Sequence, residues 1–183
     1  MGYDAALLKA WSDLEKVTKE KKLWVDFLAD KYEVDLENRR VSSLSCNVAA
    51  KVYLTILILH YLARKLEGLP SLTGEWIDFR QLDGGQGYYP AFQKRVISTI
   101  AKKYGKNPDT LLKLSERFKT KPLNFADVSL ALDTFESVPV LIEIWKSDEE
   151  FSPEANLLFD KSIKDIFCTE DIVILSESVA HSI

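Results

Sequence analysis

The sequence predicts an α+β fold in which helices surround a central buried helix and pack on a small antiparallel sheet. Helical and strand-like stretches do not alternate as βαβ units, so a parallel sheet is not expected. Residues 52–62 are apolar around most of a helical circumference, which is typical of a helix in the middle of a domain. Two alternating runs, 127–133 and 140–145, flank a short break and predict a β-hairpin.

Length and composition favour one domain with an ordinary apolar core. The chain has 183 residues, of which 46% are hydrophobic and 28% are charged. We expect a single domain over residues 1–183, with a helical and strand lead-in over 1–46 and a core over 47–183.

Charge and hydropathy exclude several classes of partner. The net charge of −4 gives no basic field for nucleic acid or for an anionic membrane. The most apolar stretch, 52–59, is far shorter than the roughly twenty residues that a bilayer span needs. No basic and apolar leader opens the chain, so we expect a cytoplasmic protein with no nucleic-acid and no membrane partner.

The two cysteines, Cys46 and Cys168, lie far apart, and neither belongs to a CxxC unit. A zinc site or an iron–sulfur cluster needs about four soft ligands at close spacing. We therefore expect no metal site and two buried thiols of a reducing compartment, with a disulfide as the less favoured alternative. The cofactor stays unknown at this stage.

The N-terminal part of the chain is expected to hold helices and one pair of strands. Apolar residues recur at helical spacing over 7–14, after Asp4, a suitable N-cap. A second short helix is expected over 24–28. Residues 32–36 and 41–45 alternate and predict two antiparallel strands.

The central helix is expected to run from a cap at Asn47 to about Leu66 and to end before Gly68. Pro90 is a suitable first residue for the next helix, which Gly105 ends.

Two short helices and a longer one are expected in the remaining chain. Asn107 and Pro108 open the first, and Ser152 and Pro153 open the second, after the predicted hairpin. Thr169 is followed by two acidic residues, which predicts the N-terminus of the last helix.

Residues 68–89 break every period and contain five of the seven glycines. This density indicates positive φ angles or a close approach of the backbone to another group. Aromatic side chains and one arginine interleave with the glycines over 74–92, which we expect to be the ligand-binding surface. The predicted ligand-binding residues, there and elsewhere, are His60, Trp76, Arg80, Gly84, Gly85, Tyr88, Trp145 and Glu149.

Each residue type in this set suits a particular contact. The aromatic rings, Trp145 among them, would supply flat contact area, and Arg80 would bind a carboxylate or phosphate through two parallel hydrogen bonds. Gly84 and Gly85 would let the backbone come close to the ligand. The alternative is a structural loop whose aromatic side chains fill the core and whose Arg80 pairs with an internal carboxylate.

Two further residues could carry acid–base chemistry. His60, on the central helix, could be a general base or an axial ligand of a haem or corrinoid, or else a core histidine bonded to its neighbours. Glu149 lies between Asp148 and Glu150 and could act as an acid or base or bind a cation. These three acidic residues could instead stabilise the helix start at Ser152.

Several short blocks, spread over about two thirds of the chain, are distinctive in combination. They are Leu59-His60-Tyr61-Leu62, Gly74-Glu75-Trp76, Phe79-Arg80-Gln81-Leu82, Gly84-Gly85, Tyr88, Pro139, Trp145, Asp148-Glu149-Glu150-Phe151, Leu158-Phe159-Asp160 and Glu170-Asp171.

Together these blocks resemble a family of uncharacterised domains from anaerobic bacteria and archaea. Some members are fused to a cysteine-rich iron–sulfur module and are described as iron–sulfur proteins for that reason. This chain lacks those cysteines, so the resemblance implies a role in anaerobic metabolism beside a redox or corrinoid-linked neighbour. It implies no cluster in this chain and no catalytic residue.

The predicted function is a binding or accessory domain that holds a small anionic or flat aromatic, tetrapyrrole-like ligand at 74–92. One alternative is an enzyme that uses His60 or Glu149 as general acid or base, with Arg80 stabilising negative charge. The other is an interaction module for an iron–sulfur or corrinoid protein partner.

Overall fold

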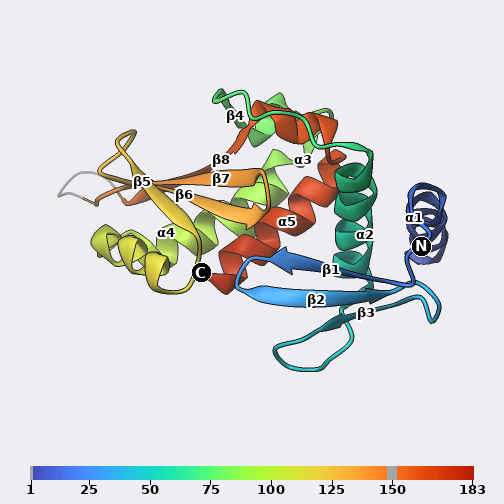
Figure 1. Ribbon diagram of the computed structural model, residues 1–183. Coiled ribbons are helices and arrows are strands. Elements are labelled where there is room, and N and C mark those ends of the chain that lie inside the picture. The colour runs from blue at the N-terminus through green and yellow to red at the C-terminus, as the bar shows by residue number, and fades with distance from the viewer. Residues whose placement is uncertain (1, 148–151) are drawn as a thin grey trace.

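Two antiparallel sheets with helices around them form the fold, which confirms the predicted α+β class (Figure 1). The computed structural model describes residues 2–147 and 152–183. One sheet has three strands in the order β1-β2-β3, and the other has five in the order β4-β8-β7-β6-β5. The strands are β1 (Lys22–Phe27), β2 (Asp30–Asp35), β3 (Arg40–Ser43), β4 (Trp76–Asp78), β5 (Thr120–Leu123), β6 (Val128–Phe135), β7 (Val138–Trp145) and β8 (Glu154–Asp160).

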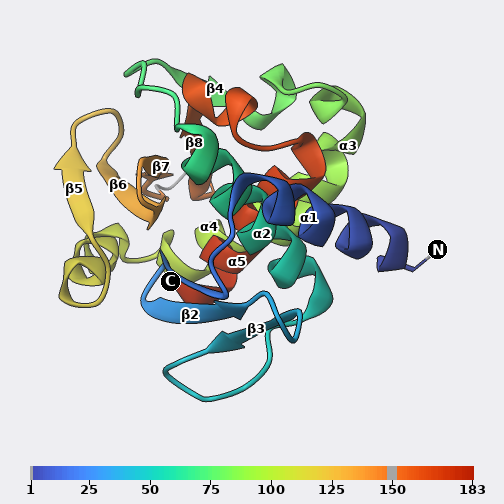
Figure 2. The same ribbon diagram turned by 45° about the vertical axis from the view of Figure 1, so that its right-hand side comes forward.

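Helices α2 and α5 lie in the middle of the molecule, and α1 packs on the outer side of α2 (Figure 2). In the part of the chain that the structure describes, no helix has the length and apolar character of a membrane span. The helices are α1 (Asp4–Val17), α2 (Val52–Glu67), α3 (Gly85–Phe92), α4 (Ser98–Tyr104) and α5 (Thr169–Ser182), the 3₁₀ segments η1 (Phe79–Gln81), η3 (Pro108–Glu116) and η4 (Lys161–Asp165), and the π-helical segment η2 (Gln93–Ile97).

Aromatic side chains join α2 to both sheets. The ring of Tyr61 on α2 stacks on Phe135 of β6 with 4.2 Å between the ring centroids. Phe27, at the end of β1, lies 4.5 Å from the same Phe135 ring. The Leu28 N–H donates to the carbonyl of Thr134 at 2.7 Å. The two sheets therefore share one apolar core with α2 at its centre, as the sequence predicts for this helix.

Most predicted elements form, with some of their ends shifted. The hairpin of β6 and β7 and the pair of β2 and β3 are confirmed, as are the first and last helices. Helix α1 begins at Asp4 itself, after Tyr3 in the capping position. Helix α2 begins at Val52 rather than after Asn47, which lies in the preceding loop with a φ of 55°.

Two segments predicted as helices are strands. Residues 24–27 belong to β1, where Val25 and Phe27 are buried and Trp24 and Asp26 are exposed. The chain after Ser152 and Pro153 enters β8, which pairs with β7 on one side and β4 on the other. In both cases pairing with neighbouring strands overrides the local helical signal.

The glycine-rich segment contains regular structure, because β4, η1 and α3 all form within it. Helix α3 begins at Gly85, ahead of the predicted start at Pro90. Pro90 lies inside this helix, and the π-helical turn η2 follows directly. Proline has no N–H to donate to the helix, so a wider turn at this point is expected.

Candidate functional site

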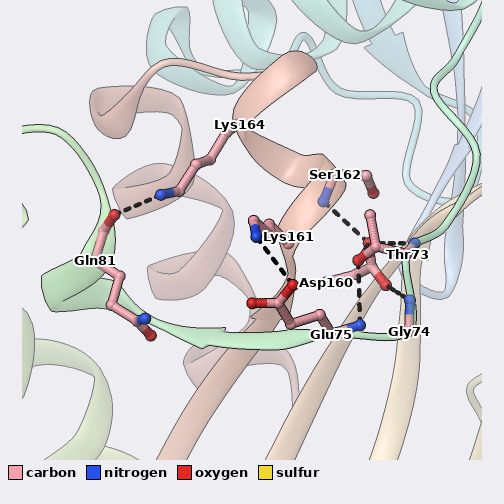
Figure 3. A network of polar contacts seen from close by, with 8 residues as sticks. All are labelled: Thr73, Gly74, Glu75, Gln81, Asp160, Lys161, Ser162 and Lys164. Carbon is pink, nitrogen blue, oxygen red and sulfur yellow. Dashed lines mark hydrogen bonds and ion pairs between the residues drawn. The ribbon is translucent and has the colours of Figure 1, made fainter.

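The glycine-rich segment is fixed at its beginning by the carboxylate of Asp160, at the end of β8 (Figure 3). This side chain accepts hydrogen bonds from the N–H and hydroxyl of Thr73, at 3.1 and 3.0 Å, and from the Gly74 N–H at 2.8 Å. The Ser162 N–H donates to it at 3.0 Å. Burial alone would raise the pKa of Asp160, but these hydrogen bonds outweigh burial and lower the pKa from 3.8 to about 2.

Further contacts hold the middle of the segment. The Lys164 ammonium donates to the carbonyl of Gln81 at 2.6 Å (Figure 3). The Thr169 hydroxyl, at the start of α5, donates to the carbonyl of Asp83 at 2.7 Å. The segment is thus fixed by η4 and α5 at several points, so a ligand would not have to order it on binding.

The glycines at the start of α3 allow a tight turn. Gly84 has a φ of 72°, a left-handed conformation that favours glycine. A Cβ on Gly85 would overlap the Phe79 carbonyl oxygen, so only glycine fits there. Phe79 in turn stacks on Phe92 with 4.0 Å between the ring centroids. The close approach that Gly85 permits is therefore to the segment's own backbone.

A groove of about 1210 Å³ lies between this segment, the three-stranded sheet and α5. Its walls come from the β1–β2 turn, the β3–α2 connection, the start of α3 and one face of α5 along its whole length. Gly84 and Tyr88 line the groove, and rings from other elements join them. These rings include Tyr32, Tyr53 and Phe118.

Arg95 is the cation that lies beside Tyr88 in the groove. Its Nη1 donates to the Tyr88 hydroxyl at 3.0 Å and to Glu177 Oε1 on α5 at 3.2 Å. Sequence analysis missed Arg95 because it placed the helix start at Pro90. Tyr88 and Arg95 are seven residues apart, a spacing that puts them on one helical face and would have revealed the pair.

Arg80, the arginine that the sequence predicted for ligand binding, does not line the groove. It makes two hydrogen bonds to Asp78, Nε to Oδ1 at 2.8 Å and Nη2 to Oδ2 at 3.0 Å. Its guanidinium lies 4.6 Å from the centroid of the Tyr89 ring. The pair with Asp78 is the kind of contact expected of the structural alternative for Arg80, and the contact with the Tyr89 ring adds a cation–π interaction to it.

The two predicted tryptophans lie on the five-stranded sheet, and neither lines the groove. Trp76 is on β4 opposite Asp160, and Trp145 is at the end of β7 opposite Glu154. Both rings are half-buried. Glu149, with its acidic neighbours, lies outside the described residues.

His60, on α2, contacts α5 and is not among the residues that line the groove. Its Nδ1 is 2.8 Å from Asp171 Oδ2, and the Cys168 thiol donates to the same oxygen at 3.2 Å. Burial raises the pKa of Cys168 to about 12. Within the described ranges, no group of three or more His, Cys, Asp or Glu side chains could hold a metal ion.

The two cysteines are free, and both are exposed as residues, so the prediction of buried thiols is wrong. The Sγ of Cys168 nevertheless points at Asp171, where the surrounding protein partly desolvates it. Cys46 lies in the connection between β3 and α2, and Cys168 lies at the N-terminus of α5. Apolar character alone does not bury a thiol when the backbone places it at the end of an element.

The comparisons with known proteins identify a family without a described activity. No curated protein and no solved structure matches the chain. A family model described as a domain of unknown function (DUF3786) matches residues 10–182, from within α1 to the end of α5. Since this match spans both sheets and all the elements around the groove, the chain belongs to the family described as domain of unknown function DUF3786.

Proposed function

We propose that the chain is a binding domain that holds a small ligand with a flat apolar part and an acidic group in the groove beside α5. The observation that carries this proposal is the groove itself, in which Tyr88 and Arg95 meet on a wall that is fixed in advance. Ligand pockets in proteins usually measure about 300–1,000 Å³ and combine an apolar lining with a few placed polar groups. The groove, at about 1210 Å³, is somewhat larger than this range and has a mixed lining of that kind.

The chemistry of the lining suits such a ligand. Tyrosine rings offer rigid flat contact area to an aromatic body. Arg95 uses only Nη1 for its hydrogen bonds to Tyr88 and Glu177, and its Nε and Nη2 bond to no other described residue. These two groups form the side of the guanidinium that pairs with a carboxylate or phosphate through two parallel bonds.

The proposal keeps Gly84 and Tyr88 from the predicted ligand-binding set and gives Arg95 the charge-recognising role that the sequence predicted for Arg80. A tetrapyrrole-like ligand and an iron–sulfur or corrinoid partner stay predictions of the sequence. A visible spectrum and native mass spectrometry of protein purified from anaerobic cells would test for a bound ligand. A tetrapyrrole absorbs visible light strongly, and a colourless ligand adds mass.

A fluorescent probe of the right chemistry tests the groove directly. Anilinonaphthalene sulfonate has a flat apolar body and one anionic group, and its fluorescence rises when water is excluded. We expect Tyr88→Ala to weaken its binding roughly 3- to 10-fold, through the lost ring contact. Arg95→Gln should weaken binding about tenfold or more, because a charge-assisted hydrogen bond is lost.

Arg80→Gln is the matched control, since it removes a guanidinium that lies outside the groove. It should leave the dissociation constant of the probe unchanged. The proposal fails if Arg80→Gln weakens binding while Arg95→Gln and Tyr88→Ala, at native melting temperature, do not.

A further inference from the structure

A second arginine lines the groove, beside the C-terminus of α5. It is Arg117, and its neighbour Phe118 lines the groove as well. The Nη1 of Arg117 donates to the carbonyl of Ser182 at 3.1 Å, and its guanidinium lies 4.9 Å from the centroid of the Phe118 ring. An arginine beside an aromatic ring therefore occurs twice in this groove, because Arg95 contacts Tyr88 farther along it.

The two arginines leave the same part of the guanidinium for a ligand. Arg117, like Arg95, uses only Nη1 for its hydrogen bonds. Its Nε and Nη2 bond to nothing in residues 2–147 and 152–183. Nε and Nη2 together can bind one carboxylate, sulfonate or phosphate through two parallel hydrogen bonds. The groove thus has two positions for an acidic group.

Contacts with α5 set the spacing between these two positions. Arg95 bonds to the Glu177 side chain, and Arg117 bonds to the Ser182 carbonyl. Glu177 and Ser182 are five residues apart on α5, which corresponds to about 7.5 Å along the helix axis. A ligand that reaches both guanidinium groups therefore carries its acidic groups on the order of 8 Å apart, at opposite ends of its body.

Two of the carboxylates that line the groove already have partners. Asp30 accepts hydrogen bonds from the Ser43 and Ser45 hydroxyls at 2.6 and 2.5 Å. Glu177 accepts from Nη1 of Arg95 at 3.2 Å and leaves the Nε and Nη2 of that arginine open. Neither carboxylate competes with a ligand for the part of the guanidinium that binds an acid in two parallel bonds.

The other two carboxylates of the lining lie at the start of α5. Asp83 is held there, because its carbonyl accepts from the Thr169 hydroxyl at 2.7 Å. Glu170 is twelve residues before Ser182, about 18 Å away along the helix axis. These negative charges are therefore distant from Arg117, and the groove beside the C-terminal end of α5 suits an acidic group.

We propose that the groove selects elongated diacids: Arg95 binds one acidic group, Arg117 binds the other, and the flat apolar body lies between them. This inference rests on the proposed function, because it specifies the ligand of the same groove rather than adding a site. Arg117 is then the residue that distinguishes a diacid from a monoacid.

Three naphthalene acids with the same ring system test the spacing. One is 2-naphthoate, with a single carboxylate. Naphthalene-2,6-dicarboxylate has two at opposite ends, and naphthalene-2,3-dicarboxylate has two side by side. The dissociation constant of each acid is measured for the full chain by isothermal titration calorimetry. We expect the 2,6-diacid to bind roughly tenfold more tightly than the other two, because only this isomer reaches both arginines.

Variants of the full chain assign this advantage of the 2,6-diacid to Arg117. Arg117→Gln should remove the advantage and leave the dissociation constant of 2-naphthoate unchanged, since the monoacid binds beside Tyr88 and Arg95. Arg117→Lys keeps the charge and a donor for the Ser182 carbonyl but not the two parallel bonds, so it should keep only part of the advantage. Arg80→Gln, outside the groove, is the control and should change none of the dissociation constants.

Three results would each overturn the inference: equal affinities of the wild type for all three acids, an equal gain for the 2,3-diacid, or an undiminished advantage in folded Arg117→Gln. If 2-naphthoate binding still depends on Arg95 in such a case, the proposed function stands without the inference. If Arg95→Gln leaves 2-naphthoate binding unchanged, the proposed function fails and the inference with it. If Arg117→Gln melts at lower temperature, Arg117→Lys decides, and an undiminished advantage there overturns the inference.

Discussion

Replacing Asp160 by Asn tests how the glycine-rich segment is held against the end of β8. Asp160 is 3% exposed. Its side chain accepts hydrogen bonds from Thr73, Gly74 and Ser162. Asparagine keeps one oxygen acceptor. Its amide group, however, takes the place of the oxygen that the Gly74 N–H now donates to, so that buried N–H loses its acceptor.

Two contributions set the size of the effect. A pKa lowered from 3.8 to about 2 corresponds to about 2 kcal/mol of folded-state stability at pH 7. A buried donor left without an acceptor costs about 1–3 kcal/mol, and it overlaps with the first contribution. We expect Asp160→Asn to lower the free energy of unfolding by about 3 kcal/mol at pH 7.

Urea unfolding between pH 7 and pH 2.5 measures the difference in free energy of unfolding between wild type and Asp160→Asn, and how that difference depends on pH. Because the folded state lowers the pKa, the stabilisation is fully present above the unfolded value of 3.8 and is lost as the pH falls toward 2. The gap between wild type and Asp160→Asn should therefore narrow over this range. Asp165→Asn, which changes an exposed carboxyl at the end of the 3₁₀ segment η4 that follows Asp160, is the control. A gap under about 0.5 kcal/mol at pH 7, or one that does not narrow, would refute the reasoning.

Three further experiments test other parts of the structure. Gly85→Ala should destabilise the fold by at least about 2 kcal/mol, because its Cβ would overlap the Phe79 carbonyl oxygen, whereas Gly87→Ala has open space and should be neutral or stabilising; equal melting temperatures would contradict this. Alkylation of Cys168 by iodoacetamide should be slow at pH 8, because desolvation of the thiol raises its pKa to about 12. The alkylation rate, measured by peptide mass spectrometry, should rise about tenfold per pH unit up to pH 10, and a rate independent of pH would contradict this prediction. Burial also raises the pKa of Glu143, so its ionised form destabilises the fold at high pH. Glu143→Gln should therefore raise the urea midpoint at pH 8 and raise it less at pH 4. The opposite trend would show that ionised Glu143 does not destabilise the fold.

Local patterns predicted the elements whose alternation fits only one kind of secondary structure. The runs 127–133 and 140–145 pair with each other across a short turn, so their alternation was sufficient. Residues 24–28 place Trp24 and Phe27 at a spacing that also fits one helical turn. The ring of Phe27 packs on Phe135, which is distant in sequence, and this contact favours the strand.

The candidate site was predictable only in part, for the same reason. Glycine density and interleaved rings pointed to Gly84 and Tyr88, which do line the groove. Arg80 has a carboxylate two residues before it, at Asp78. The sequence does not contain the side-chain geometry that decides between pairing with Asp78 and binding a ligand. Asp171 was missed as the partner of His60 because 111 residues separate the two.

The central claim is that the fixed segment and α5 form a wall that receives a flat, acidic ligand. The most direct measurement is a titration of the ¹⁵N-labelled full chain with anilinonaphthalene sulfonate, followed by amide chemical shifts. We expect the largest shifts at Gly84, Tyr88 and Arg95 and along the groove face of α5 near Val173. Shifts centred on Trp76 and Trp145 on the five-stranded sheet, with none at the start of α3, would contradict the claim.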